Sequence, residues 1–325
     1  MRVWLLFTVF LALCLNINLA LAAPDFKQRP EVQQFIAEQT DNYSEQWLSE
    51  LFEVMEYQQS ALDLFTRVPE QQLSQRQYNP IFIEPIRINR GLNFYQQNKA
   101  WFDQAYEEYG VEPDVILAII AMETNFGSFV GRHPTFDTLA TLAFDHPSRS
   151  DFFRRELVAL LQIMHEQQLS PELLVGSYAG AMGLPQFMPS SYLAYAVDHD
   201  KDGVVDIWTS PADAIGSVAN YLAVHGWQAN LPQIISAQVS GDYASILRRS
   251  TVPSVDIAEA RSTGWEFSTN LPDSTMVSPL QMDAEDGYEY WLGTANMRAV
   301  ARYNPSLRYA MTVALMSEIF AERIQ

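Results

Sequence analysis

The sequence predicts a mainly α-helical protein with a small β portion. Apolar residues recur three and four positions apart over residues 30–103 and 112–227, and again after residue 305. This is the periodicity of helices with one buried face. Over residues 228–288 the pattern changes to short alternating or β-branched runs between glycine, proline, asparagine and aspartate, which is typical of strands. Because 325 residues exceed what one compact core usually organises, we expect two or three domains.

The first element is a candidate export signal over residues 1–22. One early arginine is followed by an apolar run that ends in Ala20-Leu21-Ala22, the pattern of a secretory signal peptide. Cys14 leaves lipid anchoring open as an alternative, although Leu13 precedes it where a small residue is expected. We favour cleavage after Ala22, which predicts an exported, periplasmic protein whose mature chain contains no cysteine.

The charge of the chain limits its partners. With 39 acidic and 20 basic residues, the formal net charge is −19 at pH 7. So acidic a surface repels nucleic acid and anionic membranes, and we expect neither as a partner. No apolar span after residue 22 is long enough to cross a bilayer. Motifs of serine hydrolases, zinc hydrolases and nucleotide-binding proteins are missing, and a monomer is the default expectation.

Residues 23–110 are expected to form the N-terminal part of a helical domain. The stretches PEVQQFIAEQ, SEQWLSELFEVMEY and GLNFYQQNKAWFDQAYEEYG have helical spacing. Two prolines interrupt NPIFIEPIRINR, which we predict to be an extended connector before the third stretch.

Residues 111–228 form the next expected domain, and its first helix carries an unusual acid. Pro113 suits the first turn of a helix running towards Thr124, on which Glu123 leans back over branched aliphatic residues. Lost hydration would raise the pKa of this carboxyl, and an acid that stays protonated near neutral pH can donate a proton. From position alone, a carboxylate that reaches solvent or bonds to a neighbouring segment is the commoner case, so both interpretations stay open.

The stretch DHDKDGVVDIWTSPAD, residues 198–213, resembles an EF-hand calcium loop. Three alternating aspartates precede Gly203, where the chain must turn sharply. The standard loop ends in a glutamate six residues after the glycine, where this sequence has Thr209. The alternative is a solvated acidic turn, but the pattern favours a structural Ca²⁺ site. The expected ligands are Asp198, Asp200, Asp202, the carbonyl of Val204, and Asp206, directly or through water.

The remaining residues divide into a sheet-bearing part and a final helical part. QIISAQVSG, WEFST and MVSPLQM are the expected strands of a small β-containing domain over residues 229–288. Residues 289–325 are expected to return to helix after Asn304-Pro305 and to rejoin the helical domain.

Four stretches together resemble the membrane-bound type B family of lytic murein transglycosylases. They are AMETNFGSF, GSYAGAMGLPQFMPSSYLAYAVDHDKDGVVDIW, DAIGSVANYLAVHGW and ARYNPSLRYA, in the order that the family has them. The resemblance implies a lysozyme-like catalytic core over residues 111–228, a helical domain built from both chain ends, and a small β domain. It also implies a longer calcium loop ending at Asp213, although Ser210 to Asp213 equally suits a capping box.

By this resemblance, Glu123 matches the single catalytic acid. From spacing alone, Tyr221, Tyr303 and Tyr309 would be core residues. Ser177 would belong to a turn of small residues, and Gln186 would bond to backbone groups of a loop. The resemblance instead places these residues in a sugar-binding cleft, where Arg149 matches an arginine that meets the peptide stem. The cleft residues are Ser177, Gln186, Tyr221, Tyr303, Asn304, Tyr309 and Arg149.

The activity that the resemblance implies is cleavage of peptidoglycan glycan strands without water. The β-1,4 bond between N-acetylmuramic acid and N-acetylglucosamine would break and leave a 1,6-anhydro ring, with no organic cofactor. One acid can suffice because the substrate's acetamido group can act as the nucleophile. The alternatives are a hydrolytic muramidase and a non-catalytic, calcium-stabilised glycan-binding protein.

Overall fold

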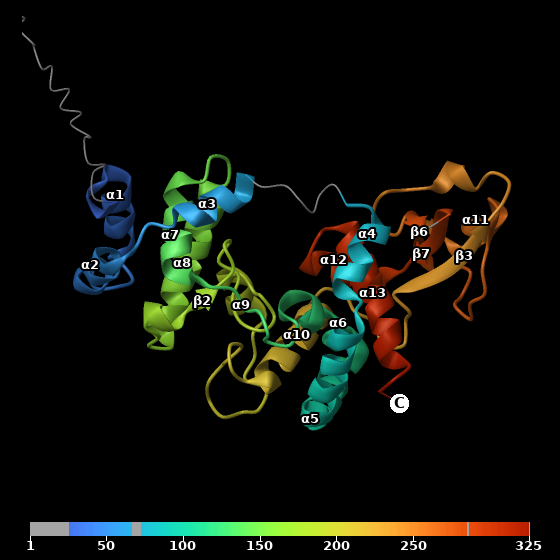
Figure 1. Ribbon diagram of the computed structural model, residues 1–325, viewed down its shortest axis with the longest axis horizontal. Coiled ribbons are helices and arrows are strands. Elements are labelled where there is room, and N and C mark those ends of the chain that lie inside the picture. The colour runs from blue at the N-terminus through green and yellow to red at the C-terminus, as the bar shows by residue number, and fades with distance from the viewer. Residues whose placement is uncertain (1–25, 67–72, 285, 325) are drawn as a thin grey trace, which may run out of the picture. The chain divides into compact units, whose positions relative to one another are not determined.

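The computed structural model describes residues 26–66, 73–284 and 286–324 (Figure 1). The predicted signal over residues 1–22, with Cys14, lies outside the described residues. Within them, the mainly helical class with a minor sheet is confirmed. Contacts between Cα atoms divide the chain into two compact units, residues 1–54 and 55–325. Across the described parts of the chain, no helix has the length and apolar character that a membrane crossing needs.

The described part of the first unit contains a short 3₁₀ helix η1 (Phe26–Gln28), α1 (Pro30–Gln39) and α2 (Glu45–Val54). Both α-helices follow the predicted periodicity, and Pro30 occupies the first turn of α1. The rings of Phe35 and Phe52 meet edge-on at 6.1 Å between centroids. The buried residues of this unit also include Val32, Ile36, Leu48 and Leu51.

The second unit begins with α3 (Gln59–Thr66), α4 (Gln75–Phe82) and α5 (Pro85–Tyr109). The extended connector predicted for NPIFIEPIRINR is therefore wrong, because the stretch lies in α4 and α5 except for Ile83 and Glu84 between them. A capping box starts α4, since the side chains of Ser74 and Gln77 each accept from the other's backbone N–H. Pro85 opens α5 in the position where proline costs no hydrogen bond.

The helix predicted from Pro113 towards Thr124 is confirmed as α6 (Pro113–Thr124). It is apolar on all sides, and every residue from Val115 to Met122 is buried. It packs against α5, α10 and α13, and Figure 1 shows α6 beside α5 and α13. The other helices of this part are α7 (Thr135–Asp145), α8 (Ser150–Glu166), α9 (Pro189–Tyr195) and α10 (Pro211–Val224).

Two short elements, β1 (His133–Pro134) and β2 (Val175–Gly176), pair antiparallel between these helices. Helices α7 and α8 pack together, and α9 packs on α8. A 3₁₀ helix, η3 (Pro171–Leu173), leads into β2. After these elements the chain runs through Ser177 to the segment around Leu184, whose carbonyl accepts a hydrogen bond from Thr124 of α6.

A five-stranded antiparallel sheet lies in the C-terminal part, with strand order β4-β6-β7-β3-β5. Its core contains the buried Trp265, Leu292 and Val277. The predicted boundary at residue 288 falls inside β7, whose pairing with β3 continues to Ile234 opposite Gly293. The elements are β3 (Ile234–Val239), η4 (Tyr243–Ile246), β4 (Val255–Asp256), α11 (Ile257–Ser262), β5 (Trp265–Glu266), β6 (Met276–Ala284) and β7 (Gly287–Gly293).

The last helices are α12 (Ala295–Tyr303) and α13 (Leu307–Ala321). Helix α13 packs on α4, α5 and α6, so a C-terminal helix covers helices from the first half of the chain. The domain boundaries at residues 110 and 228 stay predictions, because the division by contacts separates only residues 1–54 from the rest.

Candidate active site

Glu123 lies one residue before the end of the buried helix α6 and keeps partial exposure. Burial raises the pKa of its carboxyl from 4.5 to about 7, because a desolvated site disfavours the charged form. Near neutral pH, protonated and ionised forms of this carboxyl are therefore both well populated. Such a group can give up a proton and take one back without a large change in pH.

The nearest partner of this carboxyl is Tyr309 on α13, whose hydroxyl donates to Glu123 Oε1 at 2.6 Å. This bond favours the ionised form and lowers the pKa of Glu123, but burial outweighs it. The pKa of Tyr309 itself is raised well above its usual value, first by burial and then by the charge of Glu123. Tyr309 is therefore a neutral hydrogen-bond donor that orients one carboxyl oxygen.

The turn directly after Glu123 is unusual, because Asn125, Phe126 and Gly127 have φ angles of 48°, 58° and 77°. Thr124 Oγ1 accepts from Gly127 N at 3.2 Å and donates to Leu184 O at 3.0 Å. A Cβ atom on Gly127 would lie 2.9 Å from Leu184 Cδ2. Left-handed conformations in non-glycine residues persist only where the surroundings fix them, and here the segment around Leu184 does so.

Three aromatic residues form a cluster next to that segment. The Tyr221 and Tyr303 rings meet edge-on at 4.7 Å, and Phe187 lies 5.8 Å from each. The Tyr303 hydroxyl donates to Pro185 O and the Tyr221 hydroxyl to Arg302 O, both at 2.6 Å. Burial, and secondarily the charge of Glu123, raises the pKa of Tyr303 well above its usual value. The structure thus brings Tyr303 and Tyr309 to Glu123, with Tyr221 behind Tyr303.

Ser177 shapes a turn formed by small residues. Its Oγ accepts from Ala181 N at 3.0 Å and from Ala179 N at 3.2 Å. A Cβ on Gly176 would lie 2.3 Å from Ala181 O, so the turn depends on glycine there. Because the Ser177 oxygen only accepts in these two bonds, its own hydrogen remains available for a ligand.

Gln186 has a left-handed backbone, with φ of 51°, at the segment that contacts Thr124. Its side-chain amide donates to Gly183 O at 2.9 Å and to Val130 O at 3.2 Å. These bonds tie the loop after α6 to the segment around Gln186. The backbone role considered from spacing is therefore present in the structure.

The last two predicted cleft residues are Asn304, which bonds to the backbone, and Arg149, which contacts aromatic rings. Asn304 Oδ1 accepts from Ser306 N at 3.1 Å, next to the N-cap of α13. Arg149 is exposed, and its guanidinium lies 4.3 Å from the ring centroid of Phe152 and 5.4 Å from that of Phe153. The guanidinium contacts of Arg149 are thus with two phenylalanines in the first turn of α8.

The aspartate loop has the predicted convergence of carboxylates. One oxygen from each of Asp198, Asp200 and Asp202 lies within 4.8 Å of the others. Gly203 has φ of 96°, and its N–H donates to Asp198 Oδ2 at 2.9 Å. Val204 is exposed and its N–H donates to Asp202 Oδ1 at 2.8 Å. Carboxylate oxygens gathered on a sharply turned loop fit the ligand preference of calcium.

Asp206 and Asp213 have other hydrogen-bond partners in this loop. Asp206 Oδ1 accepts from Trp208 N and Thr209 N, each at 2.8 Å. The buried Asp213 accepts from His199 N at 2.8 Å through Oδ1 and from Asp206 N at 2.7 Å through Oδ2. Half of the predicted capping box is formed, since Ser210 Oγ accepts from Asp213 N at 3.2 Å. The Asp213 carboxylate closes the loop by holding its backbone.

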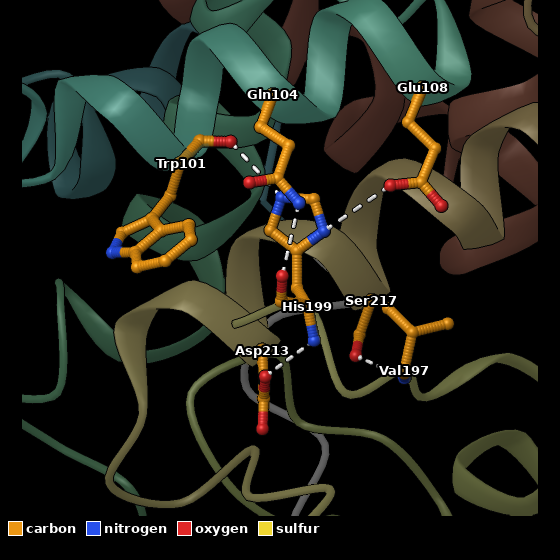
Figure 2. A network of polar contacts seen from close by, with 7 residues as sticks. All are labelled: Trp101, Gln104, Glu108, Val197, His199, Asp213 and Ser217. Atoms are coloured by element: carbon orange, nitrogen blue, oxygen red, sulfur yellow. Dashed lines mark hydrogen bonds and ion pairs between the residues drawn. The ribbon is translucent and has the colours of Figure 1, made fainter. Parts of the chain in front are cut away.

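His199, between two of the predicted ligands, was not singled out from the sequence. Figure 2 shows its ring directed at α5, where it donates from Nε2 to Trp101 O at 3.2 Å and its Nδ1 lies 3.9 Å from Glu108 Oε2. Gln104 donates to His199 O at 3.1 Å. A Cβ on Gly216 would lie 2.5 Å from the ring. Most of these partners lie about 90 or more positions away along the chain, so no local pattern in the sequence indicated this anchor.

Comparison with known proteins gives consistent relatives over most of the chain. The model of the transglycosylase SLT domain matches residues 27–318. A curated relative, membrane-bound lytic murein transglycosylase B from Escherichia coli (strain K12), is 34% identical over 320 residues. That match covers 91% of this chain and 84% of the relative.

Solved structures are similar along nearly the same length. The lytic transglycosylase Slt35 from Escherichia coli, in complex with calcium, has a TM-score of 0.85 and 35% identity, covering 93% of this chain and 96% of that one. SltB3 from Pseudomonas aeruginosa, in complex with NAG-anhNAM-pentapeptide, has a TM-score of 0.82 and 30% identity, covering 92% and 80%. The structural neighbours are lysozyme-like lytic transglycosylases.

Proposed function

Because the chain belongs to the transglycosylase SLT family and is a peptidoglycan-cleaving lytic transglycosylase, we propose that Glu123 is its single catalytic acid and base. The observation that carries this assignment is the pKa of about 7 for a carboxyl held by one tyrosine hydroxyl. An acid with this pKa can serve in both protonation states near neutral pH.

In the first step, the protonated Glu123 gives its proton to the glycosidic oxygen, and the bond from that oxygen to the muramic C1 breaks. The substrate's acetamido oxygen stabilises the developing positive charge, as in substrate-assisted glycosidases. In the second step, the ionised carboxylate takes the proton of the C6 hydroxyl, and C6–O bonds to C1. No water is consumed, and Glu123 ends protonated as it began. The relative SltB3 was solved with an anhydro-muramic ligand, which supports this product.

The neighbouring residues provide orientation and sugar contacts. Tyr309 fixes Oε1 of Glu123, and Ser177 has a hydrogen to donate to the acetamido oxygen. Aromatic faces suit the apolar faces of sugar rings, so we assign the cleft to the surroundings of Tyr303 and Tyr221. Gln186 and Asn304 complete the predicted cleft, and Arg149 is assigned to the peptide stem of the substrate.

The aspartate loop is proposed to hold a structural Ca²⁺. Asp198, Asp200 and Asp202 supply converging oxygens, and the relative Slt35 was solved in complex with calcium. Val204 carbonyl and Asp206 complete the expected ligand set. The two amide bonds of Asp213 support a role in closing the loop more directly than the ligand role that the resemblance implies. The ion would stabilise the loop and take no part in the reaction.

We propose export to the periplasm, because residues 1–22 have the pattern of a signal peptide and peptidoglycan lies there, and a monomer stays the default expectation. The relative in Escherichia coli is named as membrane-bound. We assign the soluble exported form to this chain, with cleavage after Ala22, and expect N-terminal sequencing of the native protein to begin at Ala23.

The experiment that tests the function is digestion of purified peptidoglycan by wild type and Glu123→Gln, with mass spectrometry of the soluble products. Wild type should release 1,6-anhydro sugars, and Glu123→Gln should be slower by about 10²–10⁴-fold with an unchanged circular dichroism spectrum. Products heavier by one water would show a hydrolytic muramidase. Equal release of anhydro sugars by both proteins would refute the role of Glu123.

A further inference from the structure

A concave site lies at the start of α13, next to Tyr309 along the chain. A cavity of about 740 Å³ is bounded by the β6–β7 hairpin, residues 247–249 and the residues that start α13. Arg248, Arg249 and Arg308 contribute to its lining, together with the apolar Leu247 and Leu307. We call it the arginine cavity.

The charge of this cavity is opposite to that of the chain. Among the described residues, three arginines and one acid, Asp283, line it, whereas the whole chain has a formal net charge of −19. Cations gathered in a hollow of an otherwise acidic surface attract an anionic group locally. Guanidinium groups match the geometry of a carboxylate, with two parallel N–H···O bonds.

The Arg248 side chain is held ready for such a group. Its Nη1 donates to Leu247 O at 2.8 Å and to Ser245 O at 3.3 Å. The backbone N–H of Arg248 also donates to Pro279 O at 3.1 Å, which fixes the segment to the sheet. Since Nη1 is engaged, the edge formed by Nε and Nη2 is the side of the guanidinium that can bind a carboxylate. A fixed cation loses less freedom on binding than a mobile one.

The arginine cavity is adjacent to the Glu123 site along the chain. Ser306, Leu307 and Arg308 line it, and the next residue, Tyr309, donates to Glu123. Ser306 is the N-cap of α13, so the positive end of that helix dipole also lies at the cavity. One cation of the cavity and the tyrosine that holds Glu123 are therefore consecutive residues of α13.

We propose that the arginine cavity binds the carboxylate groups of the peptide attached to the glycan strand. A peptide branch ends in a carboxylate, and its aliphatic side chains suit Leu247 and Leu307. This inference rests on the proposed function, because it takes the peptide-bearing strand as the substrate. It adds a contact for a peptide branch at the junction of the sheet and α13, besides the one assigned to Arg149 at the N-cap of α8.

The test measures affinity in the Glu123→Gln background, where the ligand is not consumed. Calorimetry would compare two tetrasaccharides of alternating N-acetylglucosamine and N-acetylmuramic acid, one with free-acid pentapeptides and one without peptides. Arg249→Glu and the pair Arg248→Ala, Arg249→Ala should weaken binding of the peptide-bearing ligand about tenfold. Neither should change binding of the peptide-free ligand, and Arg249→Lys should retain part of the affinity.

The matched control is Arg323→Glu, an equal charge change at an exposed site beyond the opposite end of α13. It should leave both affinities unchanged. Equal weakening for both ligands, or no weakening for either, would overturn the proposal. The proposal would also be overturned if inorganic phosphate bound to the cavity and abolished the difference in affinity between the two ligands, because the cavity would then be a phosphate site. Failure of the proposed function is seen separately, in the products released by wild type.

Discussion

Two acids show how differently this molecule surrounds a carboxyl group. Glu123, at the end of α6, accepts a 2.6 Å hydrogen bond from the Tyr309 hydroxyl and keeps partial exposure. Asp213, at the start of α10, is buried and accepts a backbone N–H on each oxygen, from His199 and Asp206. Burial raises the pKa of both carboxyls. Their hydrogen-bond partners are what separate a group suited to chemistry from one that holds a loop.

The difference teaches that burial alone does not make an acid catalytic. Two amide N–H donors aimed at one carboxylate need acceptors on both oxygens, so Asp213 has a structural task in its ionised form. A single hydroxyl can donate to a carboxylate or to the unprotonated oxygen of a carboxylic acid. Glu123 therefore can change protonation state while its neighbours stay in place, which is what acid and base catalysis requires.

The largest expected effect comes from making the same change in both acids at pH 8. Glu123→Gln should raise the free energy of unfolding by about 3 kcal/mol, because it removes the cost of ionising a group whose pKa is about 7 when folded and 4.5 otherwise. Asp213→Asn should lower it by about 3 kcal/mol, because an amide N–H would face a backbone N–H. Denaturant unfolding measures both.

The sign of the Glu123 effect also sets its pH dependence. A raised folded pKa means that the stability of wild type is fully present below about pH 4.5 and is lost as pH rises through about 7. The advantage of Glu123→Gln should therefore appear over this window and vanish below it. An advantage that is constant with pH would show that the Glu123 carboxyl is not the titrating group.

Calcium provides the next comparison, because it should act on the loop and leave the acid unaffected. Calcium at about 100 times its dissociation constant should stabilise wild type by about 3 kcal/mol. Asp200→Asn with Asp202→Asn should abolish that gain, while wild type stripped of calcium should keep the alkaline limb of its activity profile near pH 7. Thermal unfolding with calcium and with a chelator measures the gain, and equal gains in both proteins would contradict the site.

Gly127 and Gly203, both with positive φ, allow a smaller test of the contrast between the Glu123 site and the aspartate loop. Gly127→Ala should cost about 2–3 kcal/mol, since its Cβ would lie 2.9 Å from Leu184 Cδ2 and the backbone is left-handed. Gly203→Ala meets nothing within 4 Å and should cost only the backbone contribution, about 1 kcal/mol. Unfolding measurements on the two variants would contradict the packing argument if the costs were equal.

The smallest expected effect is that of Tyr309→Phe. Removing the hydroxyl should lower kcat about tenfold, because Oε1 of Glu123 loses its orienting donor. The same bond lowers the pKa of Glu123, so its loss should move the alkaline limb of the kcat/KM profile to higher pH. A lower rate with an unmoved limb would show that Tyr309 acts only through packing.

The sequence predicted local elements well where one signal dominated. Pro113 and Thr124 bound α6 as expected, and the runs around Ile234, Trp265 and Met276 are strands. The prediction from the sequence was wrong at NPIFIEPIRINR, where two prolines suggested an extended connector. Ser74 and Gln77 supplied a capping box, and Pro85 lies where a helix tolerates proline.

The candidate site was only partly predictable for a physical reason. The raised pKa of Glu123 follows from an acid next to aliphatic residues on its own helix, which spacing shows. The hydrogen bond from Tyr309 joins residues 186 positions apart, and no local pattern encodes such a pair. The family resemblance supplied both residues, whereas the His199 anchor was missed because its partners on α5 lie more than 90 positions away in the sequence.

The packing of α13 over α6 has a consequence for the timing of activity. During synthesis, the segment with Glu123 emerges long before the segment with Tyr309, and an all-apolar helix such as α6 needs its cover to be stable in water. The proton-transfer environment is therefore completed only when the late helix docks. Before that step Glu123 lacks both the Tyr309 hydroxyl and the burial that raises its pKa, so full activity is expected to develop last in folding.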